Sequence, residues 1–545
     1  MLKMNLEIIR VELFIIFLYF VSFGNSIASE WQWSVKVRDY VSPETNACPE
    51  AFLWIPSDCE QIRAVVVGQH NMCEEPIFEH STFRKTMADL GFAIIWITPG
   101  IDQAWDVANG CQKYFDVMLN DLADVSGYSE LSNTPIVPLG HSAMATFPWN
   151  FAAWNPDRTL AIISYHGDAP RTNLTGYGRD NLEWGRTRNI DGIPGLMIQG
   201  EYEWWEARVN PALAFRMMYP ESCISFLCDA GHGHFDVSDE VVNYISLFLR
   251  KAAQYRLPEK QPLDKSAQLR KVDIKKGWLA ERWRPDYIKR AQTTPFPEYK
   301  GDSHDAFWYF DKEMADLTEE YYANERNKKN QYIGFTQNGK FINYQNTHAG
   351  YSMEFEPEND GLTFHISPLF VDSSRIRPST NRSANGNIRA DRICGPVEKI
   401  NDTTFTVRFY HMGLNNQRRT NDIWLLASNT GDKEYKSTVQ QINIKIPYPN
   451  KDGKKQVIEF EPIKNIHRDS KPIKLNAVSD SGLPVYYYVK EGPVKIEYNK
   501  LIINKIPPRA KYPVKVTVVA WQYGRNTGAR VQTAEPVERS FNIEY

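Results

Sequence analysis

Ser142 stands at the end of a strand-like stretch, in a turn that could present it as a nucleophile. The apolar run Ile136–Leu139 is typical of a buried strand, and Gly140 and His141 lead from it into Ser142. A serine at a sharp turn between a strand and a helix exposes its Oγ, and a glycine two residues earlier leaves room for that turn. The start of the helix points free N–H groups at the serine, so we expect Ala143 N–H to stabilise an oxyanion.

The residue two positions after Ser142 is Met144, where such turns commonly have a second glycine. A methionine side chain needs space at a place where helix and strand pack closely. Patterns this short also occur at ordinary turns, so a nucleophilic Ser142 requires a base and an acid elsewhere in the chain.

Two later segments offer candidates for these roles, each directly after an apolar run. Glu201 and Glu203 follow one such run, and His232 and His234 follow the next. An imidazole beside a serine hydroxyl takes its proton, and a carboxylate behind the imidazole orients the ring and stabilises its charged form. The chain order is therefore serine, acid, histidine.

Residues 30–258 are predicted to form an α/β domain that positions these side chains. Continuous apolar runs are typical of strands buried on both faces of a parallel sheet. They alternate with helix-like segments at 81–90 and 241–253, which favours right-handed crossovers. The runs are Ala64–Val67, Phe92–Ile97, Ile136–Leu139, Leu160–Tyr165, Gly195–Ile198 and Ile224–Leu227.

This half of the chain resembles the α/β-hydrolases, whose triad has the chain order serine, acid, histidine. In that family the acid commonly lies three residues after the glycine that ends its strand, which favours Glu203 over Glu201. The histidine commonly follows a glycine, which favours His232, with His234 as the rival. The resemblance thus implies a triad of Ser142, Glu203 and His232.

The same resemblance implies a second oxyanion donor in the loop after the first parallel strand. We expect Met72 N–H in this role, with Asn71 N–H as the alternative. If neither glutamate is the acid, Asp168 after the preceding strand is the next candidate. Three further histidines near this sheet edge are interpreted as supporting or structural, namely His70, His141 and His166.

The segment Asp168–Gly192 corresponds to the substrate cap of such folds and contains Arg171, Arg179, Arg186 and Arg188. One interpretation is a packed loop whose arginines pair with neighbouring carboxylates. The other is a groove in which Arg171 and Arg179 bind a substrate carboxylate, while Trp105 and Trp204 stack on sugar rings.

The first 29 residues are typical of a secretory signal peptide. Lys3 and Arg10 precede the apolar stretch Leu13–Val21, and Ser26–Ala28 offers small residues for cleavage. This apolar stretch is short for a membrane span, which needs about 20 residues. No later stretch is long and apolar enough to be one, so we expect an exported protein that has no membrane span after cleavage.

A net charge of −3 and the lack of a long basic run argue against a nucleic-acid partner. The seven cysteines show no metal-ligand spacing, and we expect neither a metal nor a cofactor. In an oxidising compartment near neighbours could pair, and the odd number leaves at least one thiol free. The near-neighbour pairs are Cys48 with Cys59, Cys73 with Cys111, and Cys223 with Cys228.

The second half is predicted to contain two β-rich units. Residues 259–453 read as an accessory domain with one helix within 306–330, because Phe310, Met314, Leu317 and Tyr321 repeat at helical spacing. Residues 454–545 consist of short alternating strands that suit a β-sandwich and resemble bacterial Ig-like modules.

Together these features favour an exported serine esterase that acts on a polysaccharide. The four arginines of the cap suggest an acidic, uronate-containing glycan such as pectin, cleaved at a methyl ester. Acetyl or feruloyl esters, a serine peptidase of the same fold, and a non-catalytic glycan-binding protein are the alternatives. Met144 is the best argument for the last of these.

Overall fold

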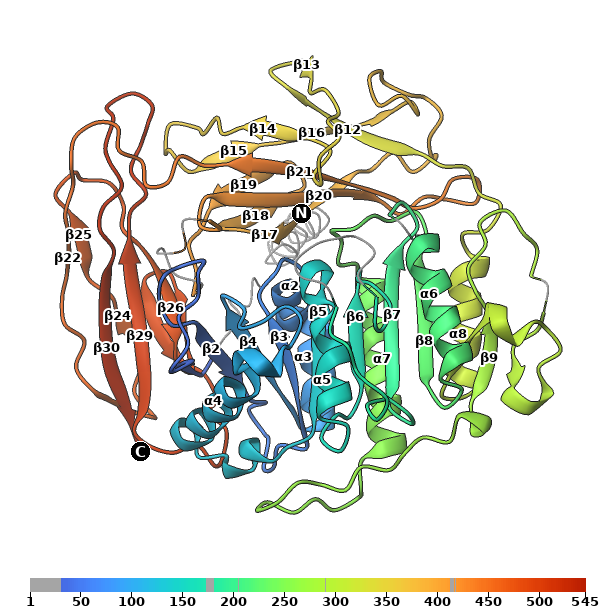
Figure 1. Ribbon diagram of the computed structural model, residues 1–545. Helices are drawn as coiled ribbons and strands as arrows, with labels where there is room; N and C mark the ends of the chain where they lie inside the picture. Colours follow the sequence, from blue (N-terminus) through green and yellow to red (C-terminus); the bar gives the residue numbers. More distant parts are fainter. Residues whose placement is uncertain (1–30, 173–180, 204, 290, 412–415, 417) are drawn as a thin grey trace, which may run out of the picture.

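The computed structural model describes residues 31–545 except 173–180, 204, 290, 412–415 and 417 (Figure 1). The predicted signal peptide, residues 1–29, lies outside the described residues. No helix among the residues described has the length and apolar character needed to cross a membrane.

A single eight-stranded sheet forms the centre of the first half. Its first two strands run antiparallel to their neighbours, and the other six are parallel. The predicted apolar runs all lie in this sheet. In spatial order the strands are β1 (Trp33–Lys36), β2 (Glu50–Trp54), β4 (Phe92–Thr98), β3 (Ala64–Gln69), β5 (Ile136–His141), β6 (Ile162–Tyr165), β7 (Pro194–Gly200) and β8 (Cys223–Asp229).

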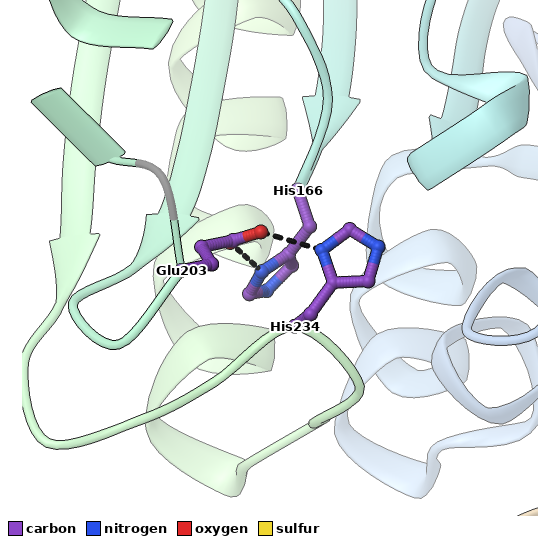
Figure 2. A group of neighbouring side chains, drawn as sticks. All are labelled: His166, Glu203 and His234. Atoms are coloured by element: carbon purple, nitrogen blue, oxygen red, sulfur yellow. Dashed lines mark hydrogen bonds and ion pairs between the residues drawn. The ribbon is translucent and has the colours of Figure 1, made fainter. Parts of the chain in front are cut away.

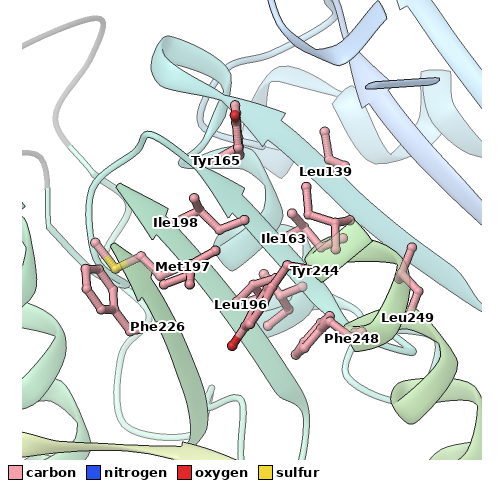
Figure 3. Close-up of a cluster of buried hydrophobic side chains, with 14 of the residues drawn as sticks. Leu139, Ile163, Tyr165, Leu196, Met197, Ile198, Phe226, Tyr244, Phe248 and Leu249 are labelled. Atoms are coloured by element: carbon pink, nitrogen blue, oxygen red, sulfur yellow. The ribbon is translucent and has the colours of Figure 1, made fainter. Parts of the chain in front are cut away.

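Both faces of this sheet are covered, which explains why its strands are continuously apolar. Along β3, Val66 belongs to one core cluster, whereas Val65 and Val67 belong to the cluster on the opposite face. Figure 3 shows α7 placing Tyr244 and Phe248 against the first of these faces. The helices are α2 (Glu74–Glu79), α3 (Ser81–Leu90), α4 (Cys111–Ser126), α5 (Phe147–Trp154), α6 (Trp205–Met218) and α7 (Asp239–Arg256).

The core of this half continues beyond residue 258. The small sheet of β9 (Trp278–Glu281), β10 (Thr294–Pro295) and β11 (Ala306–Tyr309) packs beside β8, and Phe307 stacks on Phe226 with ring centroids 4.9 Å apart. The helix expected within 306–330 is α8 (Lys312–Ala323), and its Met314 and Tyr322 are buried in the same cluster.

Three small sheets make up the middle of the chain and lie across the top of the central sheet in Figure 1. They contain β12 (Tyr332–Gln337), β13 (Lys340–Phe341) and β16 (Ser367–Val371); β14 (Ser352–Glu354), β17 (Arg389–Cys394), β20 (Asp422–Asn429) and β21 (Thr438–Lys445); and β15 (Thr363–His365), β18 (Val397–Asn401) and β19 (Thr404–Val407).

The C-terminal unit is built from mainly antiparallel strands and stands at the left of the central sheet in Figure 1. Its buried side chains join two clusters: Val516 packs with the central sheet, and Trp521 with the middle sheets. Its strands are β22 (Ile458–Phe460), β23 (Ile466–His467), β24 (Ile473–Lys474), β25 (Ala477–Ser479), β26 (Tyr486–Glu491), β27 (Val494–Glu497), β28 (Lys500–Ile503), β29 (Val514–Trp521) and β30 (Val537–Glu544).

All seven cysteines are free thiols, five of them buried. The three near-neighbour disulfides suggested by spacing are therefore not formed in this structure.

Candidate active site

The turn at Ser142 has the geometry that its sequence predicts. Strand β5 ends at His141, Ser142 adopts a left-handed backbone with φ of 53°, and a short 3₁₀ helix over Ser142–Met144 leads into α5. Non-glycine residues rarely adopt this conformation, which is typical of a strained turn that projects a serine. A Cβ on Gly140 would lie 2.1 Å from Met144 O, so glycine is required at this position.

Met144 fits into this turn because a second glycine makes room for it from another loop. Its side chain is buried, and a Cβ on Gly100 would lie 2.4 Å from Met144 Cε. The glycine that is missing two residues after the serine is thus compensated by Gly100. Met144 is therefore compatible with a nucleophile turn and no longer favours a non-catalytic protein.

His234 is the histidine that contacts Ser142. Its Nε2 lies 2.7 Å from Ser142 Oγ, and its Nδ1 lies 2.5 Å from Glu203 Oε2. Because a carboxylate only accepts hydrogen bonds, Nδ1 carries the proton and Nε2 is free to accept the serine proton. Glu203 comes from the loop after β7 and His234 from the loop after β8 (Figure 2).

His232 does not occupy this position, and its expected role as the base is wrong. Its Nδ1 bonds Asp236 and lies 3.3 Å from Asp229 Oδ2. Burial opposes a charge on this ring, but the two aspartates outweigh burial and raise the pKa of His232 to about 10. An imidazole that is already protonated at neutral pH cannot accept a proton from a serine. His232 instead faces a cavity of about 1440 Å³ between the central and middle sheets.

Besides the histidine that it orients, Glu203 accepts hydrogen bonds from several other donors. Gly200 N–H donates to its Oε1 at 2.7 Å, and Arg208 Nη1 donates to its Oε2 at 2.9 Å. Burial by itself raises the pKa of this carboxyl, but His166 and His234 outweigh burial and hold its pKa well below the ordinary value. Glu203 is therefore an anion suited to stabilise a protonated His234.

The two alternative acids have other partners. Glu201 accepts a bond from Gly231 N–H at 2.8 Å and pairs with Lys436 of the middle sheets at 2.7 Å. Asp168 lies 3.2 Å from Arg208 Nε. Neither carboxylate is the partner of His234, which selects Glu203.

Burial also prepares His234 for the role of base. It lowers the pKa of His234, and the neighbouring Glu203 only partly offsets this effect. The ring is therefore neutral around pH 7. The loop that carries it is held by His141, whose Nε2 donates to the His234 carbonyl at 3.0 Å, in line with the supporting role expected for His141.

Of the two expected oxyanion donors, Met72 N–H already has another partner. The first hydrogen bond within the 3₁₀ helix runs from Ala145 N–H to Ser142 O at 2.9 Å, and Ala143 comes before Ala145 in this helix. Because the first N–H groups of a helix have no partner within it, Ala143 N–H remains the candidate oxyanion donor. The Met72 assignment is wrong in this structure, because Met72 N–H donates to Glu74 Oε2 at 3.0 Å. Asn71 N–H donates to the same oxygen at 3.1 Å.

Two of the expected substrate-binding residues are packed into the protein. Trp105 is 1% exposed, and the rings of Phe115 and Phe151 lie 5.2 and 4.9 Å from it, so its assignment as a sugar-stacking residue is wrong. Arg171 donates to Tyr219 OH and lies 3.4 Å from Glu183, which matches the packed-loop interpretation. Arg179 and Trp204 lie outside the described residues.

We expect Trp105→Ala to lower stability and leave substrate affinity unchanged. Removing a fully buried tryptophan leaves a cavity in the core, which costs about 3–5 kcal/mol of the free energy of unfolding. Urea denaturation measures this loss, and KM of the surviving folded enzyme is the control. A raised KM with unchanged stability would return Trp105 to the substrate site.

The middle sheets close over the site from the carboxyl ends of the strands, and composition alone gave no sign of this. Arg419 Nη1 donates to Asn71 O at 2.6 Å, while its Nε pairs with Glu44 at 2.7 Å. Trp424 lies with its ring 5.0 Å from Phe235, next to His234 in the chain. The middle of the chain therefore forms part of the wall around Ser142.

Three clusters among the described residues have donor atoms close enough together to hold a metal ion. Each has three side chains whose donor atoms lie within 4.8 Å of one another: His166, Glu203 and His234; Asp229, His232 and Asp236; and Glu75, Glu79 and His411. In the cluster of His166, Glu203 and His234, each side chain has a hydrogen-bond partner, and Nε2 of His234 bonds Ser142. We interpret this cluster as a proton-handling network.

No protein-family model matches the sequence, and no curated protein matches it. Among solved structures, a thermostable esterase is 12% identical over 36% of this chain and 54% of its own, with a TM-score of 0.26. Est1E from Butyrivibrio proteoclasticus is 18% identical over 38% of this chain and 95% of its own, with a TM-score of 0.26. MGS-M1, an α/β hydrolase enzyme from a deep-sea metagenome library, is 11% identical over 42% and 98%, with a TM-score of 0.30.

The chain thus spans about half the length of the thermostable esterase that it matches. Six parallel strands, a strained serine turn after β5, and loops after β7 and β8 that meet near this serine match the arrangement that the resemblance to the α/β-hydrolases predicts.

Proposed function

We propose that this protein is a carboxylic ester hydrolase that uses Ser142 as nucleophile, His234 as base and Glu203 as the acid. The observation that carries the proposal is the continuous chain of contacts from Ser142 Oγ to His234 at 2.7 Å and from His234 to Glu203 at 2.5 Å. The strained backbone at Ser142 and the depressed pKa of Glu203 support it.

The reaction follows from these positions. Ser142 Oγ attacks the ester carbonyl carbon while His234 Nε2 takes its proton, and Glu203 stabilises the imidazolium. Ala143 N–H donates to the oxyanion of the tetrahedral intermediate. His234 then returns the proton to the departing alcohol, which leaves an acyl-enzyme. Water, deprotonated by the same histidine, hydrolyses the acyl-enzyme and restores Ser142.

We further propose that the protein is exported and that its substrate is a uronate-containing, pectin-like glycan, in which it cleaves a methyl ester. The signal-like N-terminus and the arginines of the cap support this choice. Arg186 is exposed. The arginines would bind a neighbouring free uronate, since the ester itself carries no charge.

The test is to incubate the protein with methyl-esterified pectic oligosaccharides, acetylated xylan and feruloylated oligosaccharides, and to measure the methanol, acetate and ferulate released. We expect methanol. Acetate or ferulate without methanol would refute the methyl-ester claim and keep the esterase. Cleavage of peptides would favour a peptidase, and binding without any hydrolysis a glycan-binding protein.

If methanol is released, Arg179→Ala should raise KM about tenfold for charged oligosaccharides, the scale of one lost charge-assisted hydrogen bond to a carboxylate. A small neutral methyl ester serves as the control substrate. An equal change for both substrates would show that this arginine has a structural role.

A further inference from the structure

His166 follows β6 directly, between the strand that leads to Ser142 and the strand that leads to Glu203. Its side chain is fully buried, and its backbone has a left-handed φ of 53°. Its Nδ1 bonds Glu203 Oε1, so the carboxylate bonds two imidazoles, those of His166 and His234 (Figure 2). A histidine behind the acid is not needed to complete a serine, histidine and acid triad.

The two oxygens of Glu203 have separate sets of donors. Oε1 accepts from His166 and from Gly200 N–H, and Oε2 accepts from His234 and Arg208. Because the carboxylate only accepts, His166 must carry its proton on Nδ1. With both oxygens occupied, the carboxylate has one orientation, in which Oε2 faces His234.

The backbone of His166 ties this arrangement to the sheet. Its N–H donates to Ile198 O at 2.8 Å, and its carbonyl accepts from Arg208 Nη1 at 2.9 Å. Arg208 thus contacts both His166 and Glu203. These backbone bonds do not involve the imidazole, so a substitution that tolerates the left-handed backbone, such as His166→Asn, tests the side chain separately from the strand.

We propose that His166 is a positioning residue that fixes Glu203 and weakens the hold of this carboxylate on the proton of His234. The proposal rests on the proposed function. A hydrogen bond from His166 withdraws negative charge from the carboxylate, so an imidazolium at His234 is less stabilised. The base therefore remains free to a lower pH than it would beside an unshared carboxylate.

The charged and titratable groups around His234 give the sign of this effect. Burial lowers the pKa of His234, Glu203 raises it, and His166 and Arg208 lower it. His141 faces the ring from the end of β5, with ring centroids 5.2 Å apart. Removing the His166 imidazole takes away a lowering contribution, so His234 would bind its proton more tightly. Because only neutral His234 accepts the serine proton, the acid limb of the activity profile would move to higher pH.

The experiment compares His166→Leu with His166→Asn, two side chains of similar size. Leucine tolerates the left-handed backbone less well than asparagine, so kcat is referred to the folded fraction of each variant. Asparagine keeps an N–H donor near the position of Nδ1, and leucine does not. We expect His166→Leu to lower kcat about 10- to 100-fold, the scale of one charge-assisted hydrogen bond, with KM nearly unchanged. Its acid limb should shift to higher pH, and His166→Asn should restore much of both. His304→Ala, at an exposed histidine far along the chain, is the matched control.

A second readout needs no substrate: the pKa of His234, followed by NMR of ¹⁵N-labelled imidazoles. A rise of this pKa in His166→Leu supports the proposal, and an unchanged pKa and acid limb in the folded variant overturn it. If the leucine variant does not fold, the spectrum of the wild-type protein tests the proposal instead. A His166 ring protonated on Nε2 alone could not donate from Nδ1 to Glu203, and this result would overturn the proposal. Absence of any ester hydrolysis would instead defeat the proposed function, since the titration is measured independently of activity.

Discussion

Replacing Ser142 with alanine is expected to lower kcat for ester hydrolysis about 10⁴-fold or more while leaving the fold intact. The variant lacks the atom that forms the acyl-enzyme, and single triad losses in serine hydrolases have this scale. Alanine tolerates the left-handed backbone at this position about as well as serine does. Steady-state kinetics give the rate, and thermal unfolding gives the check on the fold.

Ser57→Ala is a suitable control. Among the described residues, the Ser57 hydroxyl bonds only the exposed carboxylate of the next residue, Asp58. It should keep both the activity and the melting temperature. Turnover of folded Ser142→Ala at the wild-type rate would contradict the mechanism.

The second large effect separates two histidines that lie two residues apart. His234→Ala removes the group that takes the serine proton, so kcat should fall about 10⁴-fold at unchanged stability. His232→Ala should instead lower stability, because it leaves Asp229 and Asp236 buried without their cation, and such losses cost about 3–5 kcal/mol. Kinetics corrected for the folded fraction and urea denaturation distinguish the two effects.

The pH dependence of stability is the internal check on this pair. The pKa of His232 is raised to about 10 in the folded protein, so its stabilising effect is complete below its unfolded pKa and is lost as pH rises toward 10. The variant should lack this loss. If the stability falls in His234→Ala and the rate falls in His232→Ala, the assignment of the base is reversed.

The sheet and the turn at Ser142 could be predicted from the sequence because their signals are local. Runs buried on both faces are apolar at every position, and Gly140 before Ser142 is demanded by the turn itself. Glu203 could be chosen over Glu201 only through the family resemblance. In the structure, the reason is that Glu201 is used by Lys436, which lies more than 200 residues away in the chain.

The errors concern side chains whose direction depends on distant partners. His232 and His234 each follow a glycine, and only the loop geometry that points His232 to Asp236 distinguishes them. Trp105 lies in a loop but is buried by the rings of α4 and α5. Met72 N–H donates to Glu74, two residues later and the first residue of α2. A composition or spacing argument contains none of this information.

The most direct test of the account is covalent labelling with a fluorophosphonate. Ser142 Oγ should attack phosphorus as His234 takes its proton, with fluoride leaving, and form a stable phosphonate ester. Peptide mass spectrometry should then find the adduct on Ser142, and labelling should be lost in Ser142→Ala and strongly slowed in His234→Ala. An adduct on a different serine, or equally fast labelling of His234→Ala, would contradict the claim that Ser142 is a nucleophile activated by His234.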